Sequence, residues 1–145
     1  MKQNSKTVLM NASANTSGVS TLTASVDTKG FGYARILCLV NNTVSLGTVV
    51  TNNSLEEGDD TSTFSAVTAA APGTGWTPGT VTASSVTTLA KLAYNVDLRG
   101  RKRYLKVTLG LAATSAGVFI TADLSNPGDG CGTAAEQGAN VSVQI

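Results

Sequence analysis

Apolar and polar positions alternate with a period of two along much of this chain. The alternation is clearest over residues 92–98, 105–111 and 118–124, and it also runs through residues 19–26. Since successive side chains of a strand point to opposite faces, each of these segments predicts a half-buried β-strand. Residues 33–40 are almost continuously apolar over the length of a strand, which predicts a central, buried strand.

Gly, Asn, Asp and Pro separate these segments at intervals of roughly 8–12 residues, as is typical of β-sandwiches and barrels. Thr and Val, whose β-branched side chains favour strands, are abundant. We therefore predict an all-β fold of about seven to nine short strands in a sandwich or barrel. A helix over residues 83–94 is the weaker alternative, because Thr, Ser and Val crowd the Ala, Leu and Lys residues there.

The chain divides into a polar start and one larger unit. Residues 1–18 are polar and rich in turn formers, so we expect a flexible N-terminal arm, in which residues 7–11 could form a short strand. Residues 19–145 are expected to form a single β-sandwich domain, since 145 residues suit one core. We find no apolar run of about 18 residues and no signal-peptide pattern, so we expect no membrane partner and synthesis in a cytosol.

The chain contains no His, and this excludes most common catalytic sites. Without His there is no Ser-His-Asp or Cys-His nucleophile and no His-ligated metal, and two separated Cys cannot build a structural zinc site. No phosphate-binding or dinucleotide-binding glycine motif occurs. We therefore expect no enzyme activity, no metal and no cofactor. Cys38 is expected in the core and Cys131 in a loop, and their pairing stays open.

Two charged segments stand out in a chain that is otherwise poor in charge. Ten Lys and Arg balance nine Asp and Glu, so the whole molecule does not attract nucleic acid or anionic membranes. The acidic segment, residues 55–62, is interpreted as a solvated turn, with a loose Ca²⁺ site as the alternative. The basic segment holds half of all Lys and Arg; its members are Arg99, Arg101, Lys102, Arg103 and Lys106.

The basic segment has three possible roles. It could be a solvated hairpin end that blocks edge pairing, a surface for salt bridges to a partner protein, or a nucleic-acid contact. Tyr104 is the only aromatic residue within it, so we expect no specific nucleic-acid binding. Trp76 lies in a Pro- and Gly-rich loop, where it could either plug one end of the sandwich or anchor an interface.

A short motif occurs twice in the chain. Residues 26–30 and 96–100 share the pattern Val-Asp-x-basic-Gly, and each precedes an apolar strand. The pattern could mark a pseudo-symmetric pair of β-units. We interpret it instead as the chance recurrence of a common turn, because turns of this kind occur throughout all-β chains.

Three stretches of the sequence resemble a known class of proteins. They are DTKGFGYARI at residues 27–36, LEEGDDTSTF at 55–64 and YNVDLRGRKRYL at 94–105. In this order they resemble small virion proteins of tailed bacteriophages, namely capsid decoration (cement) proteins. The resemblance covers roughly residues 20–125 and implies an antiparallel, jelly-roll-like β-sandwich. It leaves out the N-terminal arm and the tail after Pro127.

The resemblance implies a structural role on the virion. The protein would bind the major capsid protein on the outside of an icosahedral head, as a trimer or dimer. We expect capsid contacts in the arm and the basic segment, with Trp76 as a further interface candidate; the candidate residues are Lys2, Lys6, Trp76, Arg99, Arg101, Lys102 and Arg103.

Two other functions compete with this expectation. A carbohydrate- or receptor-binding module of a phage head or tail fibre ranks second, because sugar stacking needs exposed aromatic rings. The chain has three Phe, three Tyr and one Trp, and most of them lie in expected strands. A carboxylate-based hydrolase ranks third, because it would need two acidic groups in a cleft with their pKa values pushed apart.

Overall fold

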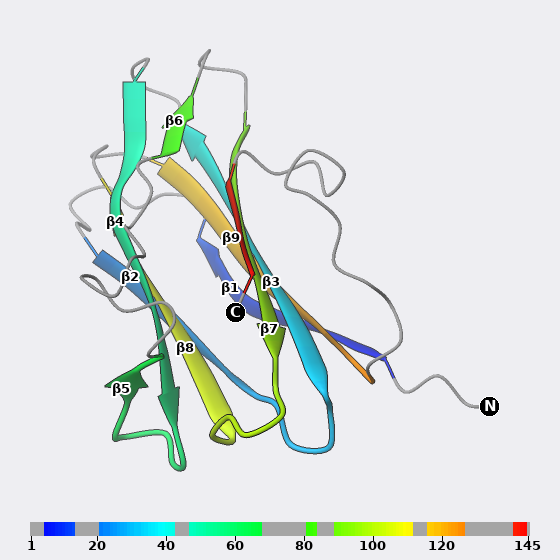
Figure 1. Ribbon diagram of the computed structural model, residues 1–145. Coiled ribbons are helices and arrows are strands. Elements are labelled where there is room, and N and C mark those ends of the chain that lie inside the picture. The colour runs from blue at the N-terminus through cyan, green and yellow to red at the C-terminus, as the bar shows by residue number, and fades with distance from the viewer. Residues whose placement is uncertain are drawn as a thin grey trace.

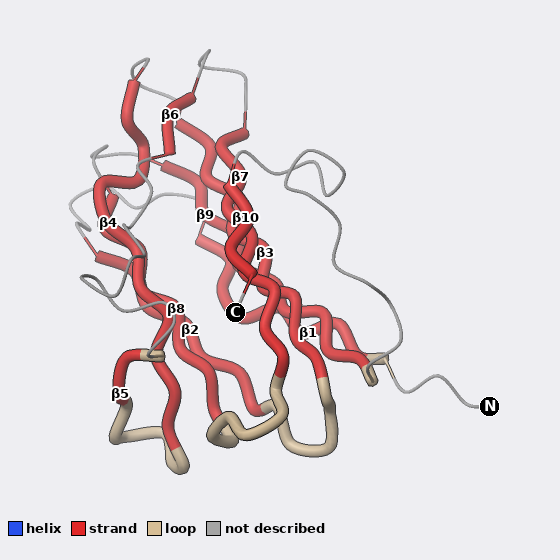
Figure 2. The backbone as a smooth tube through the Cα atoms, viewed as in Figure 1, coloured by secondary structure: helices blue, strands red, loops and turns tan. Residues whose placement is uncertain are grey.

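The computed structural model describes residues 5–13, 21–42, 47–67, 81–83, 89–111, 116–126 and 141–144. These residues form strands and loops only (Figures 1 and 2). The strands are β1 (Lys6–Ser13), β2 (Thr21–Asp27), β3 (Tyr33–Asn42), β4 (Gly47–Gly58), β5 (Ser65–Ala66), β6 (Val81–Ala83), β7 (Leu89–Asp97), β8 (Tyr104–Leu111), β9 (Ala116–Ser125) and β10 (Val141–Gln144). Within the described ranges, no helix is long and apolar enough to span a membrane.

The strands form two sheets that face each other across the core (Figure 1). One sheet has the order β1-β9-β3-β7-β10 and the other the order β2-β8-β4-β5, with β6 also paired to β4. From β1 to β4, and again from β7 to β9, each strand lies in the opposite sheet from the one before it. This is the order of two interlocked Greek keys, so the predicted jelly-roll-like β-sandwich is confirmed.

The short strands explain why ten are present among the described residues. The two-residue β5 and the three-residue β6 pair with opposite ends of β4, so together they fill one position of the jelly roll. The strand β10 adds to the free side of β7 in parallel, whereas all other pairings are antiparallel.

The core lies between the sheets and follows the predicted period of two. In β8, the inward residues are Leu105, Val107, Leu109 and Leu111, which are almost fully buried, while the residues between them are partly exposed. The strand β3 is central, as predicted, because it pairs with both β7 and β9. It is fully buried on one face only, since its outward residues retain partial exposure.

Two expectations need correction. The flexible arm expected over residues 1–18 is wrong for residues 6–13, because these pair with β9 as the edge strand β1, which contains the short strand considered at residues 7–11. The side chains of Val8 and Met10 pack against the core, which explains why this polar segment joins the sheet. The helix considered over residues 83–94 is also wrong, since residues 89–97 form β7. Residues 84–88 lie outside the described part of the chain.

Candidate functional site

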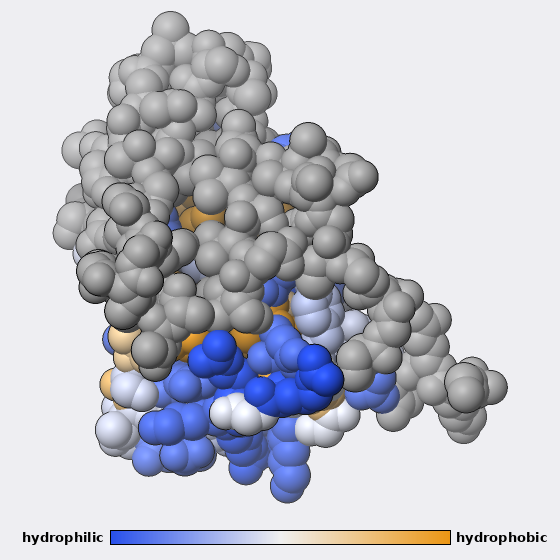
Figure 3. Space-filling model, in the orientation of Figure 1, coloured by the Kyte–Doolittle hydropathy of each residue, from blue (hydrophilic) through white to orange (hydrophobic). Residues whose placement is uncertain are grey.

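Three connections meet at one end of the sandwich (Figure 1). They are the β2–β3 turn (residues 28–32), the β4–β5 connection (residues 59–64) and the β7–β8 turn (residues 98–103). The basic and acidic segments of the sequence both lie here. We call this region the charged end, and Figure 3 shows hydrophilic residues gathered over it.

The β2–β3 turn is held by its own aspartate. Oδ1 of Asp27 accepts a hydrogen bond of 3.0 Å from the backbone N–H of Lys29, which is an Asx-type turn. The N–H of Phe31 donates to the carbonyl of Thr28 at 3.1 Å, and Gly30 closes the turn with φ of +89°. A glycine is favoured at this position because side chains with a Cβ rarely adopt positive φ.

The β7–β8 turn repeats this geometry residue for residue. Oδ1 of Asp97 accepts a 3.0 Å hydrogen bond from the N–H of Arg99. The N–H of Arg101 donates to the carbonyl of Leu98 at 3.1 Å, and Gly100 has φ of +77°. The two copies of the Val-Asp-x-basic-Gly motif therefore fold in the same way.

Two backbone hydrogen bonds also link the β2–β3 turn to the β7–β8 turn. The N–H of Thr28 donates to the carbonyl of Arg103 at 2.9 Å, and the N–H of Leu98 donates to the carbonyl of Gly32 at 2.9 Å. The β2–β3 turn leads from the sheet of β2 and β8 to the sheet of β3 and β7, and the β7–β8 turn leads back. Our interpretation of the motif as a chance recurrence is therefore wrong, because the copies form a pseudo-symmetric pair, which we call the twin turns.

Aspartates of the twin turns also bind arginines of the basic segment. Nε and Nη2 of Arg103 donate to the two carboxylate oxygens of Asp27, at 3.0 and 2.6 Å. Arg99 makes a comparable pair with Asp97, two residues before it. Hydrogen bonds from these guanidinium groups lower the pKa of both Asp27 and Asp97 to about 2, so both carboxylates stay charged near neutral pH.

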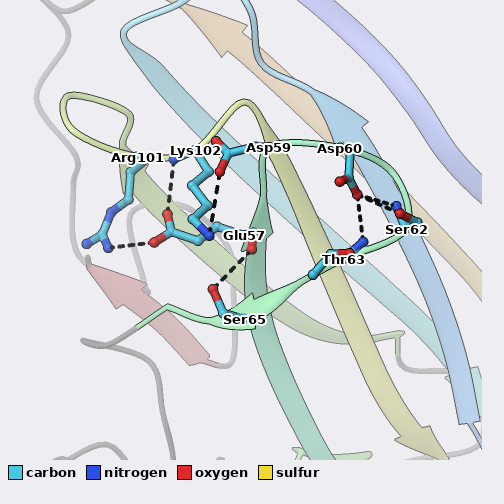
Figure 4. Close-up of polar contacts among 8 residues, drawn as sticks. All are labelled: Glu57, Asp59, Asp60, Ser62, Thr63, Ser65, Arg101 and Lys102. Carbon is cyan, nitrogen blue, oxygen red and sulfur yellow. Dashed lines mark hydrogen bonds and ion pairs between the residues drawn. The ribbon is translucent and has the colours of Figure 1, made fainter.

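The other three cations pair with the acidic segment. Nζ of Lys106 lies 2.6 Å from the Glu56 carboxylate and 4.6 Å from the centre of the Phe64 ring. The remaining two pairs are longer and are drawn in Figure 4: Arg101 lies 3.9 Å from Glu57 and Lys102 lies 3.7 Å from Asp59. The backbone N–H of Lys102 also donates to Glu57 at 3.3 Å.

The fourth acidic side chain of this segment shapes the β4–β5 connection. Oδ1 of Asp60 accepts hydrogen bonds from the N–H and the hydroxyl of Ser62, both at 2.8 Å, and from the N–H of Thr63 at 2.7 Å (Figure 4). These donors lower the pKa of Asp60. The connection is so tight that a Cβ on Gly58 would lie 2.4 Å from the carbonyl oxygen of Thr63.

These contacts bear on the alternatives left open by the sequence. All five cations of the basic segment pair with carboxylates of the same chain, so this segment is a network of internal ion pairs. The acidic segment is half strand, because residues 55–58 belong to β4. Where the structure describes the chain, no group of three or more His, Cys, Asp or Glu could hold a metal ion, so the Ca²⁺ alternative gains no support.

A pocket of about 400 Å³ opens between the twin turns. Its lining combines basic side chains with small and apolar ones: Thr28, Lys29, Gly30, Phe31, Leu98, Arg101, Lys102 and Arg103. No carboxylate belongs to this lining. The pocket has no signal in the sequence pattern, because its two halves come from turns that are far apart in the chain.

The structure brings together only part of the predicted interface. Arg101, Lys102 and Arg103 line the pocket, whereas Arg99 points outside it with 77% of its side chain exposed. Lys6 is exposed at the start of β1 and pairs in register with Leu124. Lys2, Trp76 and Cys131 lie outside the described residues. Cys38 is a fully buried free thiol on the inner face of β3.

Comparison with known proteins identifies no family for this chain. No known protein family matches, and no curated protein matches in sequence. The solved structures of similar fold include the VP2 subviral particle of infectious bursal disease virus, at a TM-score of 0.47 and 12% identity over 86% of this chain and 33% of that one. The structure of the Gx strain of that virus gives 0.46 and 14% over 90% and 34%.

A bacterial protein has a comparable score. Dimeric latent PorU from Porphyromonas gingivalis gives a TM-score of 0.42 and 12% identity, over 86% of this chain and 13% of that one. This chain thus spans about a third or less of each of these proteins. Likenesses this distant do not support a function, so the function below is inferred from the residues of the chain itself.

Proposed function

We propose that this chain is a structural virion protein, which binds the outside of an icosahedral phage capsid and stabilises it as a decoration protein. The observation that carries the proposal is the arrangement of the three stretches that resemble such proteins. Residues 27–36 and 94–105 contain the twin turns, and residues 55–64 contain the β4–β5 connection. Although they are far apart in the sequence, all three meet at the charged end.

The fold suits this role. Jelly rolls are common in viral capsid domains, although lectins and cupins share the architecture. A rigid sandwich whose end is fixed by twin turns and ion pairs can present a preformed surface. Preformed surfaces bind at low entropic cost, and many copies on one capsid add avidity. We further propose that the protein acts as a dimer or trimer on the major capsid protein, located at the capsid surface of the virion.

We also propose that the chain has no catalytic activity and needs no cofactor. A carboxylate-based enzyme needs one acidic group with a raised pKa beside another that stays charged. At the charged end, the pKa values of Asp27, Asp60 and Asp97 are all lowered, because each carboxylate accepts hydrogen bonds. These shifts suit structural anchors and are opposite to those of a general acid.

Co-sedimentation with capsids tests the proposal. The purified protein is mixed with intact heads and with heads stripped of accessory proteins, from the virus that encodes the chain. We expect saturable binding to stripped heads at a fixed ratio to the major capsid protein, together with greater resistance of the heads to heat. Absence of saturable binding would overturn the proposal, and a positive glycan array would then favour the carbohydrate-binding alternative.

A pair of variants tests whether the charged end is the contact surface. Arg101→Gln with Lys102→Gln removes two positive charges from the pocket, and both cations have long internal pairs, at 3.9 and 3.7 Å. Thr21→Glu with Thr23→Glu is the matched control, since it changes the net charge equally on the exposed face of β2. We expect the first variant to weaken head binding and the control to leave it unchanged.

A further inference from the structure

The pocket between the twin turns has an uneven distribution of charge. Four basic residues line it, whereas the carboxylates that pair with three of them lie outside the lining. Arg103 is fixed by two short hydrogen bonds to Asp27. Arg101 and Lys102 are held only by pairs of 3.9 and 3.7 Å, and Lys29 makes no ion pair with any described residue. Three cations therefore have capacity for a further anionic group.

The rest of the lining is apolar or small. Leu98 is 8% exposed, and the half-buried Phe31 packs against the core, so both present a firm apolar surface at the pocket. A ligand that fits must therefore combine an anionic group with an apolar one. Pockets that combine an apolar surface with a few placed polar groups are typical of specific binding sites.

The backbone donors of the twin turns favour a carboxylate over a phosphate. Phosphate sites typically use several free backbone N–H groups in a concave turn. Here the N–H groups of Lys29, Phe31, Arg101 and Lys102 already donate within the charged end. These four N–H groups are not available to an anion, so side chains supply its main contacts, and guanidinium groups pair with a carboxylate through two parallel hydrogen bonds.

We propose that this pocket binds a segment of a partner protein in which an acidic side chain stands next to an apolar one. The carboxylate contacts Lys29 and Arg101, and the apolar side chain lies against Phe31 and Leu98. The inference rests on the proposed function only for the identity of the partner, which would be a capsid subunit. The chemistry of the pocket itself is a property of this chain.

Nuclear magnetic resonance of the full chain tests the proposal directly. The probe is the blocked peptide acetyl-Leu-Glu-Leu-amide, and the signals are the backbone amides of Gly30 and Gly100 in a ¹⁵N-labelled sample. We expect saturable shifts of both signals. The same peptide with Gln in place of Glu should bind at least about tenfold more weakly, because it lacks the charge. A peptide with Gly in place of both Leu should also bind more weakly.

Variants locate the site on the protein. Lys29→Gln and Arg101→Gln should each weaken peptide binding about tenfold or more. Lys106→Gln is the matched control, because its side chain pairs with Glu56 and does not line the pocket; it should bind like the wild type. The dispersion of amide signals shows that each variant is folded. Equal binding by the Glu and Gln peptides, or no effect of Lys29→Gln and Arg101→Gln, would overturn the proposal.

Three further results separate this inference from others. If inorganic phosphate shifts the same signals with higher affinity than the peptide, the pocket is an anion site and the proposal is wrong. If the peptide binds as expected but the protein does not bind capsids, the pocket stands and the proposed function fails. If the protein binds capsids and peptide binding is absent, the virion role stands and this inference fails.

Discussion

Asp27 and Arg103 form a bidentate ion pair between residues that are 76 positions apart in the chain. The pair joins the last residue of β2 to the residue just before β8. The guanidinium group also lies 4.9 Å from the centre of the Tyr104 ring. The ion pair thus links the twin turns through side chains, beside the backbone hydrogen bond from Thr28 to Arg103.

The first prediction concerns the pH dependence of stability. The pKa of Asp27 falls from its ordinary value of 3.8 to about 2 in the folded chain, so the pair stabilises the fold above about pH 4 and this contribution is lost as the pH falls to about 2. Asp27→Asn should therefore lower the free energy of unfolding at pH 7, and the difference from the wild type should shrink towards pH 2. Urea unfolding at several pH values measures this.

A control separates the pair from a general loss of charge. Asp59→Asn removes a carboxylate that is 78% exposed and lies 3.7 Å from Lys102, so it should change stability little at either pH. A difference between Asp27→Asn and the wild type that does not vary with pH would contradict the explanation by the ion pair.

The second prediction exchanges the two charges. Arg103→Glu alone should destabilise the chain, because it replaces the guanidinium group that pairs with Asp27 by a second carboxylate. Combining it with Asp27→Arg restores opposite charges at the same place and should recover part of the lost stability. The coupling free energy from a double-mutant cycle measures the recovery. Purely additive effects would show that the two side chains do not interact in solution.

The third prediction distinguishes two kinds of glycine at the charged end. Gly58→Ala should destabilise by about 1–3 kcal/mol, because its Cβ would meet the Thr63 carbonyl oxygen at 2.4 Å. Gly100→Ala meets no atom within 4 Å, but its φ of +77° should cost about 1–2 kcal/mol. Asn tolerates positive φ, so Gly100→Asn should recover stability relative to Gly100→Ala. Gly58→Asn should not recover stability relative to Gly58→Ala. Thermal unfolding can compare all four variants.

The fourth prediction concerns a buried hydrogen bond in the core. The hydroxyl of Tyr94 donates to Oδ1 of Asn53 at 2.8 Å, and both side chains are buried. Tyr94→Phe should therefore destabilise by about 1–2 kcal/mol, since it removes a donor from a buried amide. Tyr104→Phe is the control, because Tyr104 is only half buried, and we expect less than about 0.5 kcal/mol. Equal effects would show that the bond contributes nothing.

The fifth prediction concerns thiol chemistry. Burial raises the pKa of Cys38 to about 12 and leaves the side chain without solvent exposure. Since only an accessible thiolate reacts, a Cys131→Ser variant should show no reaction with Ellman's reagent at pH 8 while folded. The same sample in concentrated guanidinium chloride should release one equivalent. Rapid reaction of the folded variant would show that this part of the core opens readily.

The strands that the sequence predicted well are those whose pattern is local. Leu105, Val107 and Leu109 alternate with polar residues, so a single segment shows both its conformation and its buried face. The strand β1 was expected only as a short strand over residues 7–11 because it is an edge strand; of its residues with described side chains, Val8 and Met10 pack against the core. Its partner β9 lies far along the chain, and such a pairing leaves no local signal.

The charged end illustrates the same limit. The cations of the basic segment were visible in the sequence, but their partners were not, because Asp27 and Glu57 come from other strands. The repeated turn motif was visible as well, yet four shared positions could not show that its copies lie side by side. That information is in the three-dimensional order of the strands, which sequence patterns restrict only to a few topologies.

The place of β9 between β1 and β3 has a consequence for biosynthesis. Lys6 pairs with Leu124, and Ala34 pairs with the same residue from the other side, so this sheet cannot close until β9 is made. While the ribosome adds roughly 5–20 residues per second, β1 and β3 emerge early without the strand that lies between them. A nascent chain of this kind exposes unpaired strand edges, and we expect this sheet to form only after β9 has left the ribosome and the chain to depend on dilution or chaperones to avoid aggregation until then.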